Sequence, residues 1–218
     1  MRKVLNDMIV DSVFPTNKNG KLKIINVADS YNIDVEFLGT GYKTTARAGH
    51  IRDGIVKDYL LRSVHGVGFI GIGANHAKVN GKISIAYETW RHMLERCYSP
   101  QMLKKNPTYI GCSVCSEWHD FQVFCEWFYD NYIEGYHLDK DIKVSGNKVY
   151  SKDTCLFVSA RDNIVKANAK FTSLKNPSGE VVSIYNLTDF CRSNGLSQGC
   201  IYFVISGKYK AHKGWTKA

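Results

Sequence analysis

Two cysteines separated by two residues, Cys112 and Cys115, are the first feature of this sequence that could do chemistry. Two thiolates at this spacing can hold one tetrahedral zinc ion from a tight turn. Cys97 and Cys155 would complete a four-thiolate structural zinc site if the fold brings them close. Cysteine is also among the most buried residue types, so packing in the core is the alternative for all four. The spacing does not decide between the two.

Basic residues near the C-terminal end indicate a second kind of chemistry, contact with nucleic-acid phosphates. They follow two expected short helices and are Lys208, Lys210, His212 and Lys213. The second helix would begin at Ser197 and Gln198, whose polar side chains could read base edges in the major groove. The residues that would extend the basic surface over the middle of the chain are Arg91, Arg96, Lys104 and Lys105. The alternative is a solvated domain with basic residues spread around it.

The charge balance of the whole chain agrees with a polyanionic partner. Of its 218 residues, 29 are Lys or Arg and 20 are Asp or Glu, which gives a formal net charge of +9. Such an excess favours nucleic acid or an anionic membrane surface. A hydrophobic content of 44% with 12% aromatic residues is typical of a globular chain and argues against disorder.

Two features argue against a membrane or secreted protein. No apolar run reaches the roughly 20 residues that a membrane-spanning helix needs, and Asp7 and Asp11 stand where a secretory signal would be apolar. Seven cysteines, an odd number, favour free thiols or metal ligands over a disulfide framework. We therefore expect a cytoplasmic protein in a reducing compartment, with no membrane partner.

The elements that must position these residues fall into three segments, which we predict to be domains at residues 1–82, 83–169 and 170–218. The first reads as a small β domain, because apolar residues alternate in short runs between Lys21 and Tyr59. A glycine-rich stretch at residues 64–82 then forms a loop or strand pair that leads to the second segment.

The second segment is predicted to begin with two amphipathic helices. The first starts near Ile85, ends at Ser99–Pro100 and is followed by a Lys-rich loop. The second lies within residues 115–133 and carries aromatic residues that are expected in the core. The later elements are a strand over 137–144, a loop centred on Gly146–Asn147, a strand over 155–159 and a helix over about 160–168.

The third segment is predicted to contain a hairpin around Pro177–Gly179 and two short helices joined by the turn Asn194–Gly195. This order matches a helix-turn-helix module. The fold class is therefore α+β, with a small N-terminal β domain, a mixed central core with two preceding helices and a C-terminal helix-turn-helix module.

A series of short motifs in the second segment occurs in an order that resembles a known family. In chain order they are Trp90, Met93–Leu94 and Arg96–Tyr98; Tyr109, Gly111–Cys112, Val114–Cys115 and Trp118; Phe121 and Phe124; Leu138–Asp141; Gly146–Lys148 and Tyr150–Ser151; Thr154–Cys155, Phe157–Val158 and Asn163. The family is that of phage-encoded HNH-like homing endonucleases. The tail, with NPSGE, NLTDFCRSNGLS, VISGK and HKGW, is similar to the DNA-binding modules appended to such enzymes.

The resemblance implies a ββα-metal (HNH-like) core that uses Mg²⁺ or Mn²⁺ to hydrolyse phosphodiester bonds. In such a core the metal stabilises charge on the scissile phosphate while a nearby base activates water. Asp139 and Asn163 occupy positions that match the family's metal ligands, and both offer the hard oxygens that Mg²⁺ prefers. Asp141 could supply a further carboxylate. The alternative for Asp139, Lys140 and Asp141 is a charged strand edge in solvent.

The sequence departs from the family at the general base. Lys140 stands where the HNH pattern has a histidine, and Thr154 stands at the central asparagine position. A lysine needs desolvation or cationic neighbours to act as a base. Either Lys140 acts electrostatically on the phosphate while Asp141 or the metal supplies the activated water, or the nuclease is degenerate and retained for binding. Asn147 is a third catalytic candidate, with a turn residue beside Gly146 as the alternative.

Three functions are therefore compared. The first is metal-dependent nicking or cutting of double-stranded DNA, in the host cytoplasm if the chain is phage-encoded. The second is a DNA-binding, regulatory or host-inhibiting phage protein on the same scaffold, which could have a host protein as its target. The third is binding of RNA or other single strands. Salt-dependent preference for duplexes separates the first two from the third, and metal-dependent scission separates the first from the second.

Overall fold

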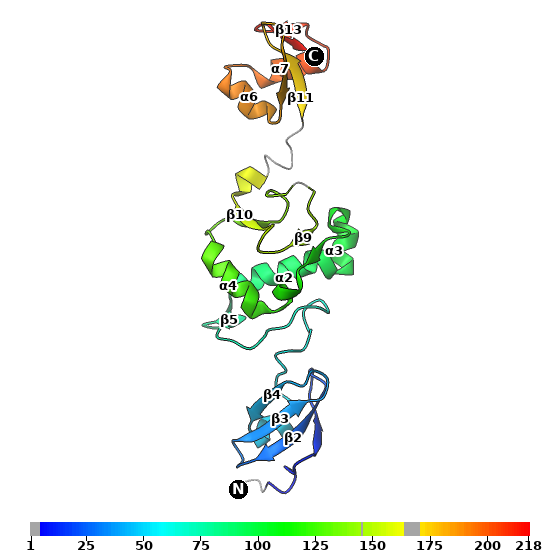
Figure 1. The fold of residues 1–218 in the computed structure, drawn as a ribbon, viewed down its shortest axis with the longest axis vertical. Helices are drawn as coiled ribbons and strands as arrows, with labels where there is room; N and C mark the ends of the chain where they lie inside the picture. Colours follow the sequence, from blue (N-terminus) through cyan, green and yellow to red (C-terminus); the bar gives the residue numbers. More distant parts are fainter. Residues whose placement is uncertain (1–4, 145, 164–170) are drawn as a thin grey trace. The chain divides into compact units, whose positions relative to one another are not determined.

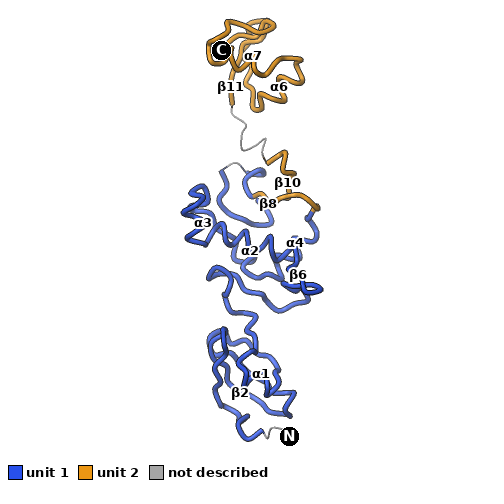
Figure 2. The backbone as a smooth tube through the Cα atoms, turned by 180° about the vertical axis from the view of Figure 1, so that it is seen from behind, with its two compact units in different colours: residues 1–132, 140–156 blue, residues 133–139, 157–218 orange. Residues whose placement is uncertain are grey.

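The fold of the protein is of the α+β class. The computed structural model describes residues 5–144, 146–163 and 171–218, in which helices and small sheets alternate along the chain (Figure 1). Two compact units are formed, residues 1–132 with 140–156 and residues 133–139 with 157–218 (Figure 2). The predicted domain boundaries at residues 82 and 169 stay predictions. Among the described helices, none has the length and apolar character that crossing a bilayer requires.

The predicted β-rich segment near the N-terminus is confirmed as an antiparallel sheet with the strand order β1–β2–β3–β4. Its strands are β1 (Val13–Pro15), β2 (Lys21–Val27), β3 (Ile33–Phe37) and β4 (Lys43–Ala46). Buried and half-buried residues alternate along β3, because one face of the sheet packs in a core and the other meets solvent. The short helix α1 (Ala48–Arg52) adds Ala48 and Ile51 to that core.

Two amphipathic helices pack together through aromatic side chains. Helix α2 (Ile85–Tyr98) is confirmed and begins at Ser84, whose hydroxyl accepts a hydrogen bond from the Tyr87 amide. Helix α4 (Phe121–Asn131) begins later than predicted, because Ser116–His119 forms the separate 3-10 turn η2. The rings of Trp90 and Phe121 lie 5.3 Å apart, so the apolar faces of α2 and α4 meet in one core.

The Lys-rich segment after α2 was predicted to be a loop, and that prediction is wrong. Residues Pro100–Lys105 form helix α3, followed by the 3-10 turn η1 (Pro107–Tyr109). Ser99 caps α3 by accepting a hydrogen bond from the Met102 amide, and Pro100 occupies the first helical position, where its missing N–H costs nothing. The Ser-Pro pair that ends α2 therefore also starts α3.

The strand predicted over residues 137–144 is shorter than expected. Strand β8 (His137–Asp139) ends at Asp139 and pairs with β10 (Leu156–Val158). Strand β9 (Val149–Tyr150) instead pairs in parallel with β7 (Ser113–Val114). Residues 160–163 are helical, and the remainder of the helix predicted to reach Asn168 lies outside the described residues.

The predicted hairpin and the two helices of the C-terminal segment are confirmed. The elements there are β11 (Thr172–Lys175), β12 (Val181–Ile184), α6 (Leu187–Ser193), α7 (Gln198–Ile205), β13 (Ala211–His212) and β14 (Trp215–Lys217). The last two strands were not predicted, and they complete a sheet with the order β12–β11–β14–β13. Leu174, Cys191 and Ile201 are among the residues of its separate buried core.

The glycine-rich stretch was predicted to be a loop or a strand pair. It contains the short antiparallel strands β5 (Lys78–Val79) and β6 (Lys82–Ile83), which form a strand pair. Upstream of this pair the backbone runs close to α2. A Cβ atom on Gly68 would lie 2.5 Å from a methyl carbon of Leu94 and 2.8 Å from the Trp90 ring. Only glycine allows this approach of the backbone to the helix.

Candidate functional site

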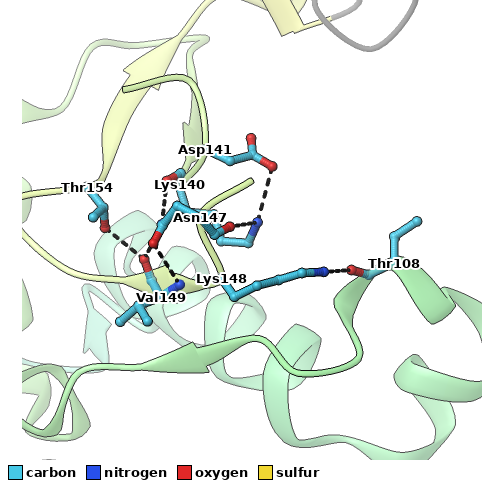
Figure 3. A network of polar contacts seen from close by, with 7 residues as sticks. All are labelled: Thr108, Lys140, Asp141, Asn147, Lys148, Val149 and Thr154. Carbon is cyan, nitrogen blue, oxygen red and sulfur yellow. Dashed lines mark hydrogen bonds and ion pairs between the residues drawn. The ribbon is translucent and has the colours of Figure 1, made fainter. Parts of the chain in front are cut away.

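The loop that follows β8 is closed by reciprocal contacts between Lys140 and Asn147 (Figure 3). The Lys140 ammonium donates to the backbone carbonyl of Asn147 at 3.0 Å, and the Asn147 amide donates to the carbonyl of Lys140 at 2.7 Å. The same ammonium forms an ion pair with Asp141 at 3.2 Å. The three residues predicted to be catalytic therefore lie in one network, which joins the two ends of the loop.

The end of the loop is bound to Val149, the first residue of the strand that follows it. The Asn147 side chain donates to the Val149 carbonyl at 2.7 Å and accepts from the Val149 amide at 3.2 Å. The Thr154 hydroxyl donates to the same carbonyl at 2.7 Å. The Lys148 ammonium donates to the carbonyl of Thr108 at 2.9 Å (Figure 3). Thr154, at the family's asparagine position, thus helps to hold the start of β9.

Lys140 lies in the interior, where it is 8% exposed. Its ammonium lies 5.8 Å from the centre of the Tyr150 ring, within the range of a cation–π contact. Burial raises the pKa of the Tyr150 hydroxyl, so that this ring remains neutral. A buried charge needs partners of this kind. These contacts use the ammonium as a donor to the protein, whereas a general base must present an unprotonated amine.

Asp139 and Asn163, the predicted metal ligands, come from two elements that both adjoin strand β10: one pairs with it and the other follows it in the chain. Asp139 is the last residue of β8, which pairs with β10, and Asn163 lies in the helical residues directly after β10. Both side chains are half-buried and both belong to the unit of residues 133–139 and 157–218. A carboxylate and an amide oxygen are donors that fit Mg²⁺ or Mn²⁺, which commonly keep waters and one or two protein ligands.

The four cysteines of the predicted zinc site are not joined in disulfides. Cys97, Cys112 and Cys155 are buried, whereas Cys115 is partly exposed. Burial raises the pKa of Cys97 to about 12, and the nearby Cys112 thiol adds to the shift. Among residues 5–144, 146–163 and 171–218, no three His, Cys, Asp or Glu side chains form a group that could hold a metal ion. Zinc binding stays a prediction.

The predicted DNA-contacting residues of the C-terminal segment divide into two sets. Lys208 and Lys210 are exposed, and the Lys208 ammonium lies 5.3 Å from the centre of the Phe203 ring. Two others have structural contacts: the His212 ring accepts a hydrogen bond from the Ser197 amide at 3.2 Å, and Lys213 donates to the Gly195 carbonyl at 2.7 Å. These bonds tie the β13–β14 turn to the turn between α6 and α7.

Ser197 and Gln198 lie at the start of α7, as predicted from the sequence. Ser197 is the N-cap, and its hydroxyl accepts from the Cys200 amide at 3.4 Å. Gln198 is the first residue of the helix and is exposed. The Ser197 hydroxyl therefore has a capping role in the free protein, while the Gln198 side chain is accessible.

In the middle of the chain, the predicted basic contacts also differ in accessibility. Lys104 and Lys105 are exposed in the last turn of α3. Arg91 is half-buried and pairs with Glu95, one helical turn away, at 3.4 Å. The two lysines are thus the more available phosphate contacts.

One buried polar residue, Gln122, was missed by the sequence analysis. Its amide donates to the carbonyls of Ile70 and Asn75 at 2.9 and 3.0 Å, and its carbonyl oxygen accepts from the Asn75 amide at 3.0 Å. A glutamine between the buried aromatic residues of α4 is the signal that could have revealed it, because buried polar groups need partners.

Comparison with known proteins gives one structural similarity. No family model matches the chain, and no curated protein matches it. A solved structure of the HNH homing endonuclease I-HmuI, described as one of DNA binding and cleavage, is similar at 22% sequence identity with a TM-score of 0.23. The match covers 40% of this chain and 59% of the I-HmuI chain, so this chain spans less than two thirds of that protein.

Proposed function

We propose that the protein binds double-stranded DNA and, with Mg²⁺ or Mn²⁺, hydrolyses phosphodiester bonds by nicking or cutting. The observation that carries the proposal is the pairing of β8 with β10 ahead of the helical residues 160–163. In this order Asp139 and Asn163 supply two oxygen ligands from neighbouring elements of one compact unit. A ββα-metal core requires this order of elements.

The chemistry is divided among the chain's own residues. The metal, held by Asp139 and Asn163, would stabilise the charge that develops on the scissile phosphate and the leaving oxygen. Asp141, whose side chain is 38% exposed, would accept the proton of the attacking water. Asn147 keeps the loop that carries Asp141 in place through its bonds to Lys140 and Val149.

Exposed lysines support duplex DNA as the partner. Lys104 and Lys105 on α3, and Lys208 and Lys210 after α7, are available to contact phosphates, in a chain with a net charge of +9. Helices α6 and α7 would act as a helix-turn-helix, with the exposed Gln198 at the start of the second helix directed to base edges.

A second candidate function, DNA binding without cleavage, is favoured by the interior position of Lys140. The residue at the general-base position is 8% exposed and donates within its own loop. A nuclease that has lost its base keeps the fold and the basic surface, and such a protein would serve as a DNA-binding, regulatory or host-inhibiting factor.

The experiment that separates the two is a nicking assay on supercoiled plasmid with Mg²⁺ or Mn²⁺, beside EDTA. Under the first proposal, the Asp139→Ala and Asn163→Ala variants lose the activity while Asp153→Ala, an exposed turn residue, retains it. Duplex and single-stranded DNA binding are measured in parallel over a range of salt.

The outcomes are distinct. Metal-dependent nicking that disappears in the two ligand variants supports the nuclease. Salt-sensitive duplex binding without nicking supports the second candidate. Tighter binding to single strands than to duplexes contradicts both.

A further inference from the structure

The hairpin formed by β5 and β6, residues 78–83, is unusually exposed for an ordered element. All four strand residues are exposed, including the apolar Val79 and Ile83 at 52% and 54%. Asn80 and Gly81 form its turn with φ angles of +51° and +77°, the left-handed pair that a type I′ hairpin turn requires. Because an isolated two-stranded hairpin is marginally stable in water, its ends must be held by other contacts.

The two ends of the 78–83 hairpin are connected to helices α4 and α2. Before it, the buried Gln122 side chain binds both backbone groups of Asn75, the amide at 3.0 Å and the carbonyl at 3.0 Å. After it, the Ser84 amide donates to the Ala77 carbonyl at 3.0 Å, and Ser84 caps helix α2. The segments on either side of the hairpin are therefore attached to α4 and α2, while the side chains of the hairpin itself are exposed to solvent.

The segment of sequence that contains the hairpin carries charge of one sign. No Asp or Glu occurs between Asp58 and Glu88, whereas Lys78 and Lys82 are both exposed. The register pairs Lys78 with Ile83 and Val79 with Lys82. Since directly paired residues of an antiparallel ribbon lie on the same face, the two lysines lie on opposite faces, each beside one aliphatic side chain.

We propose that the 78–83 hairpin inserts into the major groove of duplex DNA, with Lys78 and Lys82 contacting phosphates on its two opposite walls. The major groove admits a two-stranded ribbon, and lysines on opposite faces of such a ribbon match the two phosphate backbones that border the groove. Asn80 at the tip is then the residue nearest to the base edges. This inference rests on the proposed duplex-DNA binding and adds a second groove-entering element to helix α7, which the proposed function already directs to base edges.

The test is the binding of the full chain to duplex DNA at several salt concentrations, comparing wild type with Lys78→Ala/Lys82→Ala. The control is Lys18→Ala/Lys57→Ala, which removes the same charge from two exposed lysines outside the hairpin. We expect the hairpin variant to bind about tenfold more weakly. The slope of log affinity against log salt should fall by about 2, one for each lost phosphate contact. The control should change neither quantity to this extent.

Each result has a separate meaning. Wild-type protein that fails to bind duplexes overturns the proposed function and this inference with it. Wild-type binding that the hairpin variant retains, or that both variants lose equally, overturns only the hairpin inference. An equal loss of affinity for single strands and duplexes also overturns it, because single strands have no groove.

Discussion

The loop at residues 140–148 and the hairpin at residues 78–83 use their lysines in opposite ways. In the loop, Lys140 is 8% exposed and its ammonium contacts Asp141 and the Asn147 carbonyl. In the hairpin, Lys78 and Lys82 are exposed. Hydrogen bonds of Gln122 and Ser84 to the segment before the hairpin hold the ribbon in place. The first lysine contributes its charge to the fold, and the other two present theirs to solvent.

Position in the fold, and not residue type, therefore decides what a basic side chain does. A buried ammonium must satisfy its hydrogen bonds internally, because an unpaired buried charge is costly. An exposed ammonium keeps its hydration until a phosphate replaces it.

The largest expected effect is on stability, from Lys140→Ala. This change removes the bonds to Asp141 and Asn147 and the contact with Tyr150, so we expect a loss of about 2–3 kcal/mol in the free energy of unfolding. Urea unfolding measures it. The matched control, Lys78→Ala, should stay within about 0.5 kcal/mol of wild type. Equal losses from the two changes would contradict the comparison.

Asn147→Ala should cost about 2 kcal/mol, because it leaves the carbonyls of Lys140 and Val149 each without one donor. A double-mutant cycle with Lys140→Ala tests whether the contributions of the two residues to stability are coupled. We expect a coupling of about 1 kcal/mol between contacting residues. Additive losses would show that each side chain acts alone.

Gln122→Ala should release the hairpin without affecting the 140–148 loop. Its loss leaves the backbone groups of Asn75 unpaired, at a cost of about 1–2 kcal/mol. Limited trypsin digestion followed by mass spectrometry should show faster cleavage after Lys78 and Lys82, with cleavage after Lys148 unchanged. Gln101→Ala, an exposed residue of α3, is the control. Uniform acceleration at all sites would argue for global destabilisation.

The effect that is smallest near neutral pH concerns the ionisation of a thiol in the interior near Lys140. Burial raises the pKa of Cys97 from its ordinary 9.0 to about 12, so this thiol ionises first in the unfolded chain as the pH rises. Stability should therefore fall between pH 9.0 and about 12, by at most about 1.4 kcal/mol per pH unit for this proton. Urea unfolding at pH 8 to 10.5 should give a shallower decline for Cys97→Ala. An unchanged decline would assign it to other groups.

Elements with strong local signals were predictable from the sequence. Helix α2 combines an apolar face at helical spacing with the Ser84 cap, and β3 alternates apolar and polar residues. Helix α3 was missed because its lysines suggested a loop, although Ser99–Pro100 is a strong helix start. The end of β8 was missed because Lys140 turns toward Asn147, a contact that residue alternation does not encode.

The amino-acid sequence was enough to establish the α+β class, the basic charge and the order of the motifs that contain Asp139, Lys140 and Asn163, since periodicity, composition and chain order are local properties. Tertiary contacts were needed to show that Lys140 is buried in its loop, that β9 pairs with β7, and that Gln122 binds the segment before the exposed hairpin. These facts depend on residues far apart in the chain, and burial and hydrogen bonding exist only after the fold has brought them together.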